Sequence, residues 1–379
     1  MSDARAGGRE PGSPRVQQRI PAIYMRGGTS RCLVFHARDL PEPGPARDRI
    51  LLSALGSPDP YGRQLDGLGG GISSLSKAVI IGPPTHPDAQ VDYTFAQVEV
   101  RKPVVDYKGN CGNCSSSVGP FAIDEKLVPV TGGVTPVRIH NTNTKKIIVA
   151  HVPVTDGEAA VGGDFELAGI PGRGAKIALD FLDPGGAGTG RLLPTGQARE
   201  VIDGVEASLV DATNAVVFVR ARDLGVTGTE TPTAIDDDTA LMARLEAIRV
   251  EAGRRMGITG SAAAPKIAMV AAPTAFTALD GLAYAAERVD VVGRAISMGN
   301  CHRAFPLTVA MCVGVAARIE GTLVHECASG RAGDVRLGQP SGVLPLDARV
   351  QRKGGEPWAE KVTVYRTARR LMEGFVRVP

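Results

Sequence analysis

A cysteine in a loop of small residues is the first candidate for chemistry. It lies in DYKGNCGNCSSSVGPFAI, residues 106–123, where Gly and Asn allow tight turns and small side chains leave backbone N–H groups open as a helix begins. N–H groups in this position form an anion-binding nest and stabilise a thiolate. The sequence therefore predicts a lowered pKa for Cys111 and a role for it as an acid or base.

Two other interpretations of this cysteine stay open. A free cysteine is often a small apolar residue that is buried in a tight turn. Cys111 and Cys114 also form a CxxC, which is typical of redox pairs and half of a zinc site, although no second CxxC and no His pair accompanies it. The recurrence of Gly-Asn-Cys at Cys301 favours the catalytic interpretation.

A lysine at the start of an apolar strand is the second candidate. In GLGGGISSLSKAVIIGP, residues 67–83, three glycines and a serine-rich stretch with Ser73 and Ser74 lead to Lys77. Such a loop holds one amine at the edge of a rigid strand, and a lysine kept near other cations or away from water can act as a base. The alternative is a solvated lysine before a strand. The pattern GxxxxGK[ST] is absent, so the loop is not a phosphate-binding P-loop.

Three further segments combine small residues with hydrogen-bond donors. MRGGTS, residues 25–30, has a glycine pair that permits close backbone approach, and its polar groups can bind a carboxylate or form a plain hairpin turn. The others are MGNCHR, residues 298–303, and GQPSG, residues 338–342, where His302 is either a proton relay or a structural histidine. The candidates for substrate binding in these segments are Arg26, Gly27, Gly28, Thr29, Ser30, Gly299, Asn300, Cys301, His302 and Ser341.

The elements that position these residues occur twice along the chain. TSRCLVFHARDL, residues 29–40, matches TNAVVFVRARDL, residues 213–224, without a gap. The same order of elements recurs at Lys77 and Lys266, at Gly109-Asn110-Cys111 and Gly299-Asn300-Cys301, and at AKIALDFLDP from Ala175 and EKVTVYRTAR from Glu360. We therefore expect a disordered tail at 1–18, similar domains at 19–197 and 198–379, and a site between them.

Hydrophobic patterning predicts strands and a few helices. Strands are expected at IPAIYM, KAVIIG, DYTFAQVEV and KIIVAHVPV, and amphipathic helices at RDRILLSALG and ALMARLEAIRVEAGRRMG. FPLTVAMCVGVAARI, after Cys301, is apolar on every face, which is typical of a buried central helix with Pro306 in its first turn. Pro120 predicts that the matching helix after Cys111 starts late or is kinked.

Composition excludes several classes of protein. The 379 residues carry a net charge of +3, and their Lys and Arg residues are scattered, so no nucleic-acid partner is expected. No apolar run approaches the ~20 residues that span a bilayer, and the N-terminus lacks the apolar core of a signal peptide, so a cytoplasmic protein without a membrane partner is expected. The six cysteines are then expected to be reduced thiols.

These motifs resemble one family, the PrpF-type isomerases, over most of the chain from Ile20 onward. The resemblance rests on MRGGTS, RDRILLSALGSPD, QLDGLGGGISSLSK, VDYTFAQV, GNCGN with GPFAI, SMGN with a following His, and GQPSG. It implies a diaminopimelate epimerase-like α+β fold of two pseudo-symmetric domains, each a curled, mostly antiparallel sheet around a central helix. The active site of this fold lies between the domains.

The resemblance also implies an activity. Lys77 and Cys111 match the family's proton-transfer residues, which move a proton along a small unsaturated di- or tricarboxylic acid without a cofactor or metal. Backbone N–H groups of Gly28, Gly112 and Asn113 would stabilise the dienolate anion. A two-cysteine racemase that uses Cys301 and a non-catalytic carboxylate-binding module are the rivals. A homodimer is compatible with these features.

Overall fold

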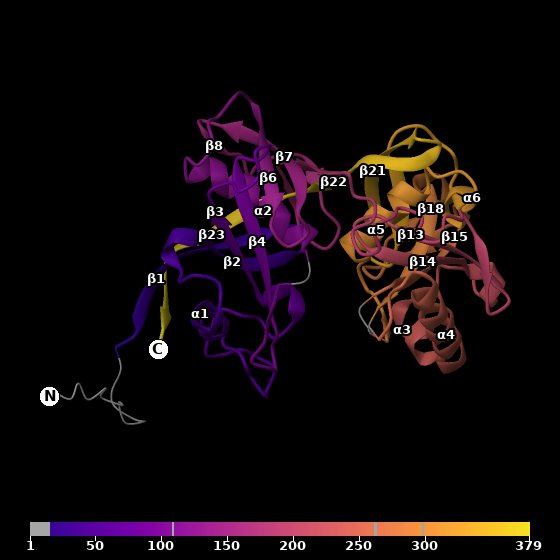
Figure 1. The fold of residues 1–379 in the computed structure, drawn as a ribbon, viewed down its shortest axis with the longest axis horizontal. Helices are drawn as coiled ribbons and strands as arrows, with labels where there is room; N and C mark the ends of the chain where they lie inside the picture. Colours follow the sequence, from indigo (N-terminus) through magenta and orange to yellow (C-terminus); the bar gives the residue numbers. More distant parts are fainter. Residues whose placement is uncertain (1–15, 108–109, 261–263, 298) are drawn as a thin grey trace, which may run out of the picture.

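The computed structural model describes residues 16–107, 110–260, 264–297 and 299–379. They form two lobes of similar build, each a curved sheet wrapped around a helix (Figure 1). These central helices are α2 (Gly112–Asp124) in the first lobe and α5 (Leu307–Ala316) in the second. The predicted α+β fold of two similar halves is confirmed. Most of the predicted tail lies outside the described residues, as do Gly109 and Met298 of the repeated motifs.

Short strands joined by tight turns build the first lobe. Its strands are β1 (Gln18–Gly27), β2 (Ser30–His36), β3 (Lys77–Gly82), β4 (Val91–Val98), β5 (Val105–Asp106), β6 (Val134–Asn141), β7 (Lys146–Thr155), β8 (Glu158–Ala159), β9 (Phe165–Glu166), β10 (Arg173–Gly174) and β11 (Ile177–Leu182). Besides α2 it has the helices η1 (Ala37–Asp39), α1 (Pro45–Leu55) and η2 (Ser73–Leu75). The four strands and the helix predicted here are confirmed, because β-branched and amphipathic patterns mark them.

The second lobe repeats this plan. Its strands are β12 (Glu200–Ile202), β13 (Val205–Asp211), β14 (Ala215–Arg220), β15 (Lys266–Ala271), β16 (Phe276–Thr277), β17 (Ala283–Tyr284), β18 (Val291–Ser297), β19 (Asn300–Cys301), β20 (Val335–Gln339), β21 (Gly342–Lys353) and β22 (Glu356–Arg366). The last strand of the chain is β23 (Ala368–Val378). Besides α5 it has η3 (Ala221–Leu224), α3 (Pro232–Asp237), α4 (Thr239–Arg255), η4 (Ala286–Arg288) and α6 (Leu323–Cys327). The amphipathic helix and the buried central helix predicted here are confirmed.

The lobes share the register of their strands. β2 pairs in parallel with β3 and places Leu33 opposite Ala78, while β14 pairs in parallel with β15 and places Val217 opposite Ile267. Leu33 and Val217 are equivalent in the sequence repeat, and so are Ala78 and Ile267. In each lobe the next strand, β4 or β18, is antiparallel, and it then has a parallel partner, β6 or β20. The sheets are therefore mostly antiparallel with parallel steps at equivalent places.

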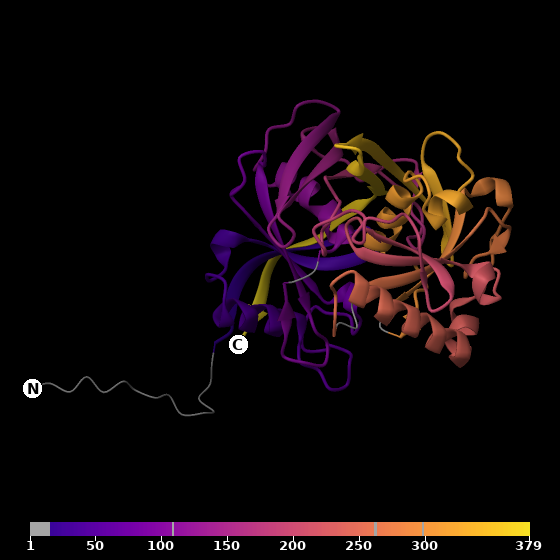
Figure 2. The ribbon, with the colours of Figure 1, turned by 45° about the vertical axis from the view of Figure 1, so that its right-hand side comes forward.

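The sheet of the second lobe packs against a different helix on each face. Phe218 and Val270 belong to the core that contains α5, whereas their neighbours Val217 and Met269 pack with α4 in a separate core. Successive side chains of a strand point to opposite faces, which explains the alternation. Figures 1 and 2 show α4 on the outside of the second lobe. No helix in the described ranges is long and apolar enough to cross a membrane.

Two equivalent strands join the lobes. β11 pairs antiparallel with β22, and Leu179 lies opposite Val364, its counterpart in the repeat. The pseudo-two-fold axis therefore passes close to this pair. Next to it the buried carboxylate of Asp180 accepts hydrogen bonds from Thr363 Oγ1 at 2.6 Å and Lys361 Nζ at 2.8 Å across the junction.

Replacing Asp180 with asparagine is expected to destabilise this junction. Burial alone would raise the pKa of Asp180, but hydrogen bonds from His151, Lys361 and Thr363 outweigh burial and hold the pKa below its usual range. A carboxyl with a depressed folded-state pKa stabilises the fold above its unfolded-state value near 4, and this contribution is lost as the pH falls. We expect a loss of about 2 kcal/mol in the free energy of urea unfolding near pH 7.

This loss should shrink at about pH 3, because the Asp180 carboxyl of the unfolded wild type takes up a proton below about pH 4, which favours the unfolded state. The exposed Asp88, changed to asparagine, is the matched control and should unfold like the wild type at both pH values. An equal loss at both pH values would show that the charge of Asp180 does not stabilise the junction.

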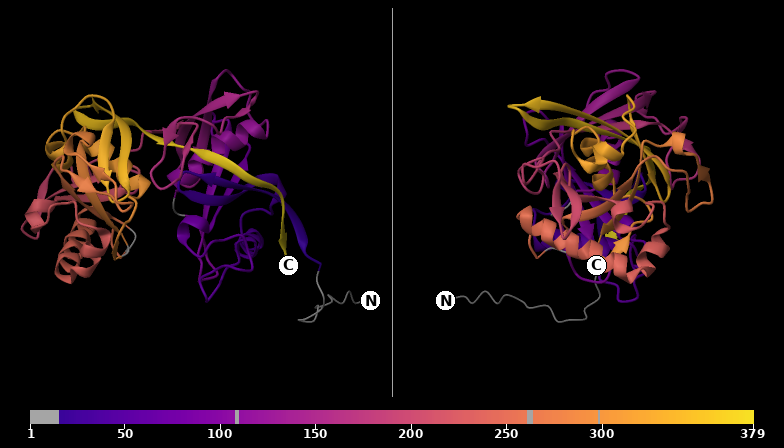
Figure 3. Two further views of the ribbon diagram at one scale, coloured as in Figure 1. Left: turned by 180° about the vertical axis from the view of Figure 1, so that it is seen from behind. Right: turned by 90° about the vertical axis from the view of Figure 1, so that its right-hand side faces the viewer.

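The last strand returns to the first lobe. β23 pairs antiparallel with β1 along its length, from Gln18 opposite Val378 to Gly27 opposite Ala368. Figure 3 (left) shows this yellow segment leaving the second lobe and crossing the first. The sequence assigned all of 198–379 to the second half, whereas residues 368–378 complete the sheet of the first lobe. Strand pairing across more than 300 residues leaves no local signal, and we keep the boundary near residue 198 as a proposal with β23 moved to the first lobe.

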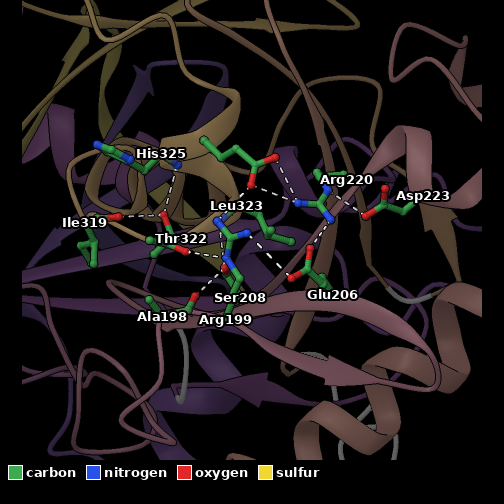
Figure 4. A network of polar contacts seen from close by, with 12 residues as sticks. Ala198, Arg199, Glu206, Ser208, Arg220, Asp223, Ile319, Thr322, Leu323 and His325 are labelled. Atoms are coloured by element: carbon green, nitrogen blue, oxygen red, sulfur yellow. Dashed lines mark hydrogen bonds and ion pairs between the residues drawn. The ribbon is translucent and has the colours of Figure 1, made fainter.

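Polar contacts hold the chain just after this boundary to the second lobe (Figure 4). Ser208 Oγ donates to Ala198 O at 2.6 Å and accepts from Leu323 N at 2.9 Å. Arg199 Nη2 forms an ion pair of 2.9 Å with Glu326 on α6. These contacts place the segment that follows residue 198 with the second lobe.

Candidate active site

Cys111 is the N-cap residue of α2, at the helix N-terminus predicted for it. Its Sγ accepts a hydrogen bond from Cys114 N at 3.4 Å, and its carbonyl accepts one from Tyr93 OH at 3.3 Å. The helix starts directly at Gly112 and continues through Pro120, so the predicted late start is wrong. Burial of α2 on nearly all sides offsets the hydrogen bond that the proline cannot donate.

The glycine pair of the β1–β2 turn lies against this helix N-terminus. A Cβ on Gly27 would lie 2.5 Å from Asn113 O, and one on Gly28, whose φ is +52°, would lie 2.3 Å from Asn113 Oδ1. Any side chain larger than hydrogen would therefore push the turn away from α2. Asn113 Nδ2 also donates to Thr29 Oγ1 at 3.0 Å, which fixes the turn beside Cys111.

Arg26 and Ser30 flank this turn. Arg26 Nη1 donates to Gly28 O, Thr367 O and Thr367 Oγ1 at 2.9–3.0 Å. That nitrogen braces the turn, while Arg26 also lines a cavity of about 1220 Å³ behind β1 and β23. Ser30 is buried in β2. Carboxylate binding by these two residues stays a prediction.

Lys77 is the first residue of β3, as predicted, and it is 7% exposed. It lies on the face of β3 whose apolar residues pack on α2, and its ammonium lies 5.1 Å from the centre of the Phe95 ring. Lys77 Nζ donates to Gln97 Oε1, which lies directly opposite it on β4. Gln97 Nε2 donates in turn to Ser73 O and Ser76 O, so one amide holds both the lysine and the serine loop.

The lysine and the cysteine act on each other electrostatically. A side-chain hydrogen bond with Cys114 and burial raise the pKa of Cys111 well above its usual range, and the positive charge of Lys77 and the Cys114 N–H only partly oppose them. The predicted lowered pKa is therefore wrong for the free protein. The helix N-terminus does act on the sulfur, but the neighbouring thiol and the loss of solvent outweigh it. Cys111 rests as a protonated thiol next to the cation of Lys77.

Changing Gln97 to leucine is expected to lower kcat by about 10-fold to 100-fold with a smaller effect on KM. The substitution removes the acceptor that aims Lys77, and a hydrogen bond to a charged group contributes about 1.5–3 kcal/mol. The measurement is steady-state kinetics beside a thermal melt. Gln351→Leu, at an exposed site on β21, is the control and should leave both constants unchanged. An unaltered kcat in the Gln97 variant would mean that Lys77 needs no such support.

The N-termini of the two central helices meet. A Cβ on Gly112, the first residue of α2, would lie 2.6 Å from Leu307 Cδ2 at the first residue of α5. In the first lobe, Asn113 of α2 donates a hydrogen bond to Thr29 in the β1–β2 turn. In the second lobe, Thr308 Oγ1 of α5 accepts one from Asn214 Nδ2 in the turn between β13 and β14. Both helix dipoles therefore point their positive ends, ~+0.5 charge each, toward a shared region.

Cys301 is not the counterpart of Cys111, which corrects the alignment of the two Gly-Asn-Cys motifs. The N-cap of α5 is Pro306, and Cys301 lies five residues earlier, in β19, opposite Ile296 of β18. Its side chain is 5% exposed and belongs to the core around α4, on the other face of the sheet from α5. Burial also raises its pKa to about 12. The two cysteines therefore do not face each other at the helix N-termini.

The other predicted residues of the second lobe lie around the approach to α5. Gly299 is exposed in the β18–β19 turn, and Asn300 is exposed at the start of β19. His302 is half-buried, and burial together with the charge of Lys266 lowers its pKa. Ser341 Oγ donates to Arg303 O. The neighbouring Gln339, which was not predicted, accepts from Phe305 N at 2.9 Å and so fixes the backbone just before α5.

Sequence reasoning missed two residues of the first lobe's site. Gln97 stands in the motif VDYTFAQV, and its role follows only once Lys77 is known to lie opposite it. Arg366 ends β22, and its Nε donates to Asn113 Oδ1 at 3.0 Å. Among the described residues no group of three or more His, Cys, Asp or Glu side chains is arranged to hold a metal ion.

Comparison with known proteins agrees with this architecture. The 3-methylitaconate isomerase of Eubacterium barkeri is 44% identical over 96% of this chain and 98% of its own. The 2-methyl-aconitate isomerase of Shewanella oneidensis is 43% identical over the same shares. A crystal structure of methylitaconate-delta-isomerase has a TM-score of 0.87 and 43% identity, and covers 96% of both chains.

A more distant structure shows the fold alone. The hydroxyproline epimerase of Agrobacterium vitis has a TM-score of 0.52 at 13% identity, covering 95% of this chain and 92% of its own. It supports the epimerase-like fold and carries nothing about the reaction. The family model described as PrpF protein matches residues 17–379. This chain therefore belongs to the PrpF family.

Proposed function

We propose that this chain is a cofactor-independent isomerase that catalyses a 1,3-allylic proton shift on a small unsaturated di- or tricarboxylic acid. The observation that supports the proposal is that the charge of Lys77 acts on the thiol of Cys111 at the N-terminus of α2, in a chain whose relatives are named as isomerases of methylitaconate and methylaconitate. A di- or tricarboxylate suits the positive ends of two facing helices.

The reaction needs one proton acceptor and one proton donor. A base removes a proton from the carbon beside the carboxylate and C=C unit, and the electron pair spreads over the dienolate. An acid then protonates the far carbon, so the double bond moves and no atom is gained or lost. The raised pKa of Cys111 favours its thiol as the donor, which leaves Lys77, once deprotonated, as the acceptor. Return of the proton from the lysine to the thiolate restores the neutral lysine and the thiol with which the turnover began.

Stabilisation of the dienolate sets the height of the barrier. The N–H groups of Gly112 and Asn113 lie in the first turn of α2, where no helical carbonyl uses them. The Gly28 N–H donates to Thr367 O at 2.9 Å, so that group is occupied in the free protein and is not part of the proposed anion hole. Loss of one such donor typically costs ~100-fold or more in rate.

An NMR screen in D₂O is the test of this function. Unsaturated di- and tricarboxylates, beginning with 2-methylaconitate and 3-methylitaconate, are incubated with the purified chain, and deuterium is followed at the allylic carbons. Deuterium at the far carbon, together with a moved double bond, is expected. Inversion of a stereocentre without double-bond movement would favour a racemase, and binding without exchange would favour a carboxylate-binding module.

The two-cysteine racemase is the weaker alternative. It requires Cys111 and Cys301 on opposite sides of one substrate, whereas Cys301 packs in the core around α4. We also propose a cytoplasmic location, which is supported by the six cysteines, all of them free thiols.

Activity without a metal is expected as well. The proposed chemistry uses only side-chain acids, bases and backbone N–H groups. Dialysis against a chelator should therefore leave the turnover number unchanged. A loss of activity that an added divalent metal restores would contradict this expectation.

A further inference from the structure

A buried arginine lies at the candidate site without an acidic partner. Arg366, the last residue of β22, is 5% exposed. Its Nε donates to Asn113 Oδ1 at 3.0 Å, and its Nη1 donates to Tyr365 O at 2.7 Å. A Cβ on Gly28 would lie 2.9 Å from Arg366 Cδ, so the glycine makes room for this side chain. Both recorded acceptors are neutral, and no Asp or Glu in the described ranges forms an ion pair with this guanidinium.

One edge of the guanidinium remains available. The group has five N–H donors, and the Nη2 pair has no acceptor among the described residues. Nη2 is also not one of their fully enclosed polar atoms without a partner, so it keeps some exposure to solvent. A cation that is buried without a counter-ion is costly, and an arriving anion would remove that cost.

The position of Arg366 relates this edge to the reacting groups. Asn113 connects Arg366 to the first turn of α2, directly after Cys111. Burial lowers the pKa of Arg366 to about 10, while the cysteine opposes this shift. Even so, the guanidinium is charged at neutral pH. It is therefore a fixed positive charge next to the thiol.

We propose that Arg366 binds a carboxylate of the substrate through its free Nη2 edge and so holds the reacting carbons against Cys111 and Lys77. The planar guanidinium suits bidentate or side-on pairing with a carboxylate, which a point charge does not reproduce. Arg366 lies on the strand that crosses between the lobes, so the contact couples substrate binding to the junction. This inference takes only one thing from the proposed function, namely that the ligand is a small di- or tricarboxylic acid.

Calorimetric titration with tricarballylate, a saturated tricarboxylate that cannot be turned over, is the direct test. Arg366→Met is expected to weaken binding by about 100-fold and Arg366→Lys by about 10-fold, because lysine keeps the charge but not the planar fork. Arg377→Met removes an exposed arginine from the adjoining strand β23 and should bind like the wild type. Equal affinity of all variants would overturn the proposal.

A second measurement needs no substitution, in case the methionine variant does not fold. Wild-type protein is modified with phenylglyoxal, and labelling of Arg366 is mapped by mass spectrometry with and without tricarballylate. Protection of Arg366 but not of Arg377 is expected. Labelling that tricarballylate does not change would overturn the proposal on the unaltered chain.

A purely structural role, or an action on the thiol alone, gives different results. If Arg366 binds a carboxylate, the Arg366→Met variant should show a large rise in KM with a smaller fall in kcat. Without ligand, iodoacetamide at alkaline pH should alkylate Cys111 of this variant at a rate close to that of the wild type. Slower alkylation with unchanged tricarballylate binding would assign Arg366 to the thiol and overturn the proposal. If the wild type binds tricarballylate through Arg366 yet exchanges no proton in D₂O, the proposed function fails and this inference stands.

Discussion

Replacing Cys111 with serine is expected to lower kcat by ~10³-fold while the protein stays folded. Serine keeps the hydrogen bond that the Cys111 side chain accepts from Cys114 N, and it is among the best N-cap residues, so α2 should still form. Its hydroxyl is a far weaker acid than a thiol and cannot deliver the proton to the far carbon at a useful rate. Steady-state kinetics and a thermal melt on the same preparation check both parts of the expectation.

Two controls sharpen this test. Cys327→Ser removes a half-buried thiol from α6 in the second lobe and should keep wild-type turnover. Cys301→Ser should also retain most activity, because that side chain packs around α4 and not at the helix N-termini. Loss of activity in the Cys301 variant with an unchanged melting temperature would revive the two-cysteine mechanism, and wild-type turnover by the Cys111 variant would remove Cys111 from the reaction.

Local patterning was sufficient to predict most elements and the positions of Lys77 and Cys111 within them. Lys77 opens a strand because β-branched residues follow a run of glycine and serine, and Cys111 caps a helix because small residues precede an apolar segment. The repeat aligned Leu33 with Val217, and the two residues have equivalent registers in the structure, since a strand that slips by one residue would turn its core side chains toward solvent.

Features that depend on distant contacts could not be predicted in this way. The shared Gly-Asn-Cys motif aligned Cys301 with Cys111. The start of α5 at Pro306 is instead set by the β18–β19 hairpin before it and by Gln339 from another strand. The pKa of Cys111 follows from burial and from Cys114, which a helix N-terminus alone does not reveal. Arg366 reaches the site only because β22 and β23 cross back to the first lobe.

Replacing Lys77 with methionine should also lower kcat by ~10³-fold, because it removes the proposed proton acceptor while keeping an apolar stem of similar length over Phe95. Lys266→Met is the matched control, since Lys266 opens the equivalent strand β15 in the second lobe and should not be required for turnover. Deuterium exchange at the carbon that loses its proton should disappear in the Lys77 variant. If exchange there persists while double-bond movement stops, Lys77 is the donor and Cys111 the acceptor, so this experiment fixes the direction of transfer.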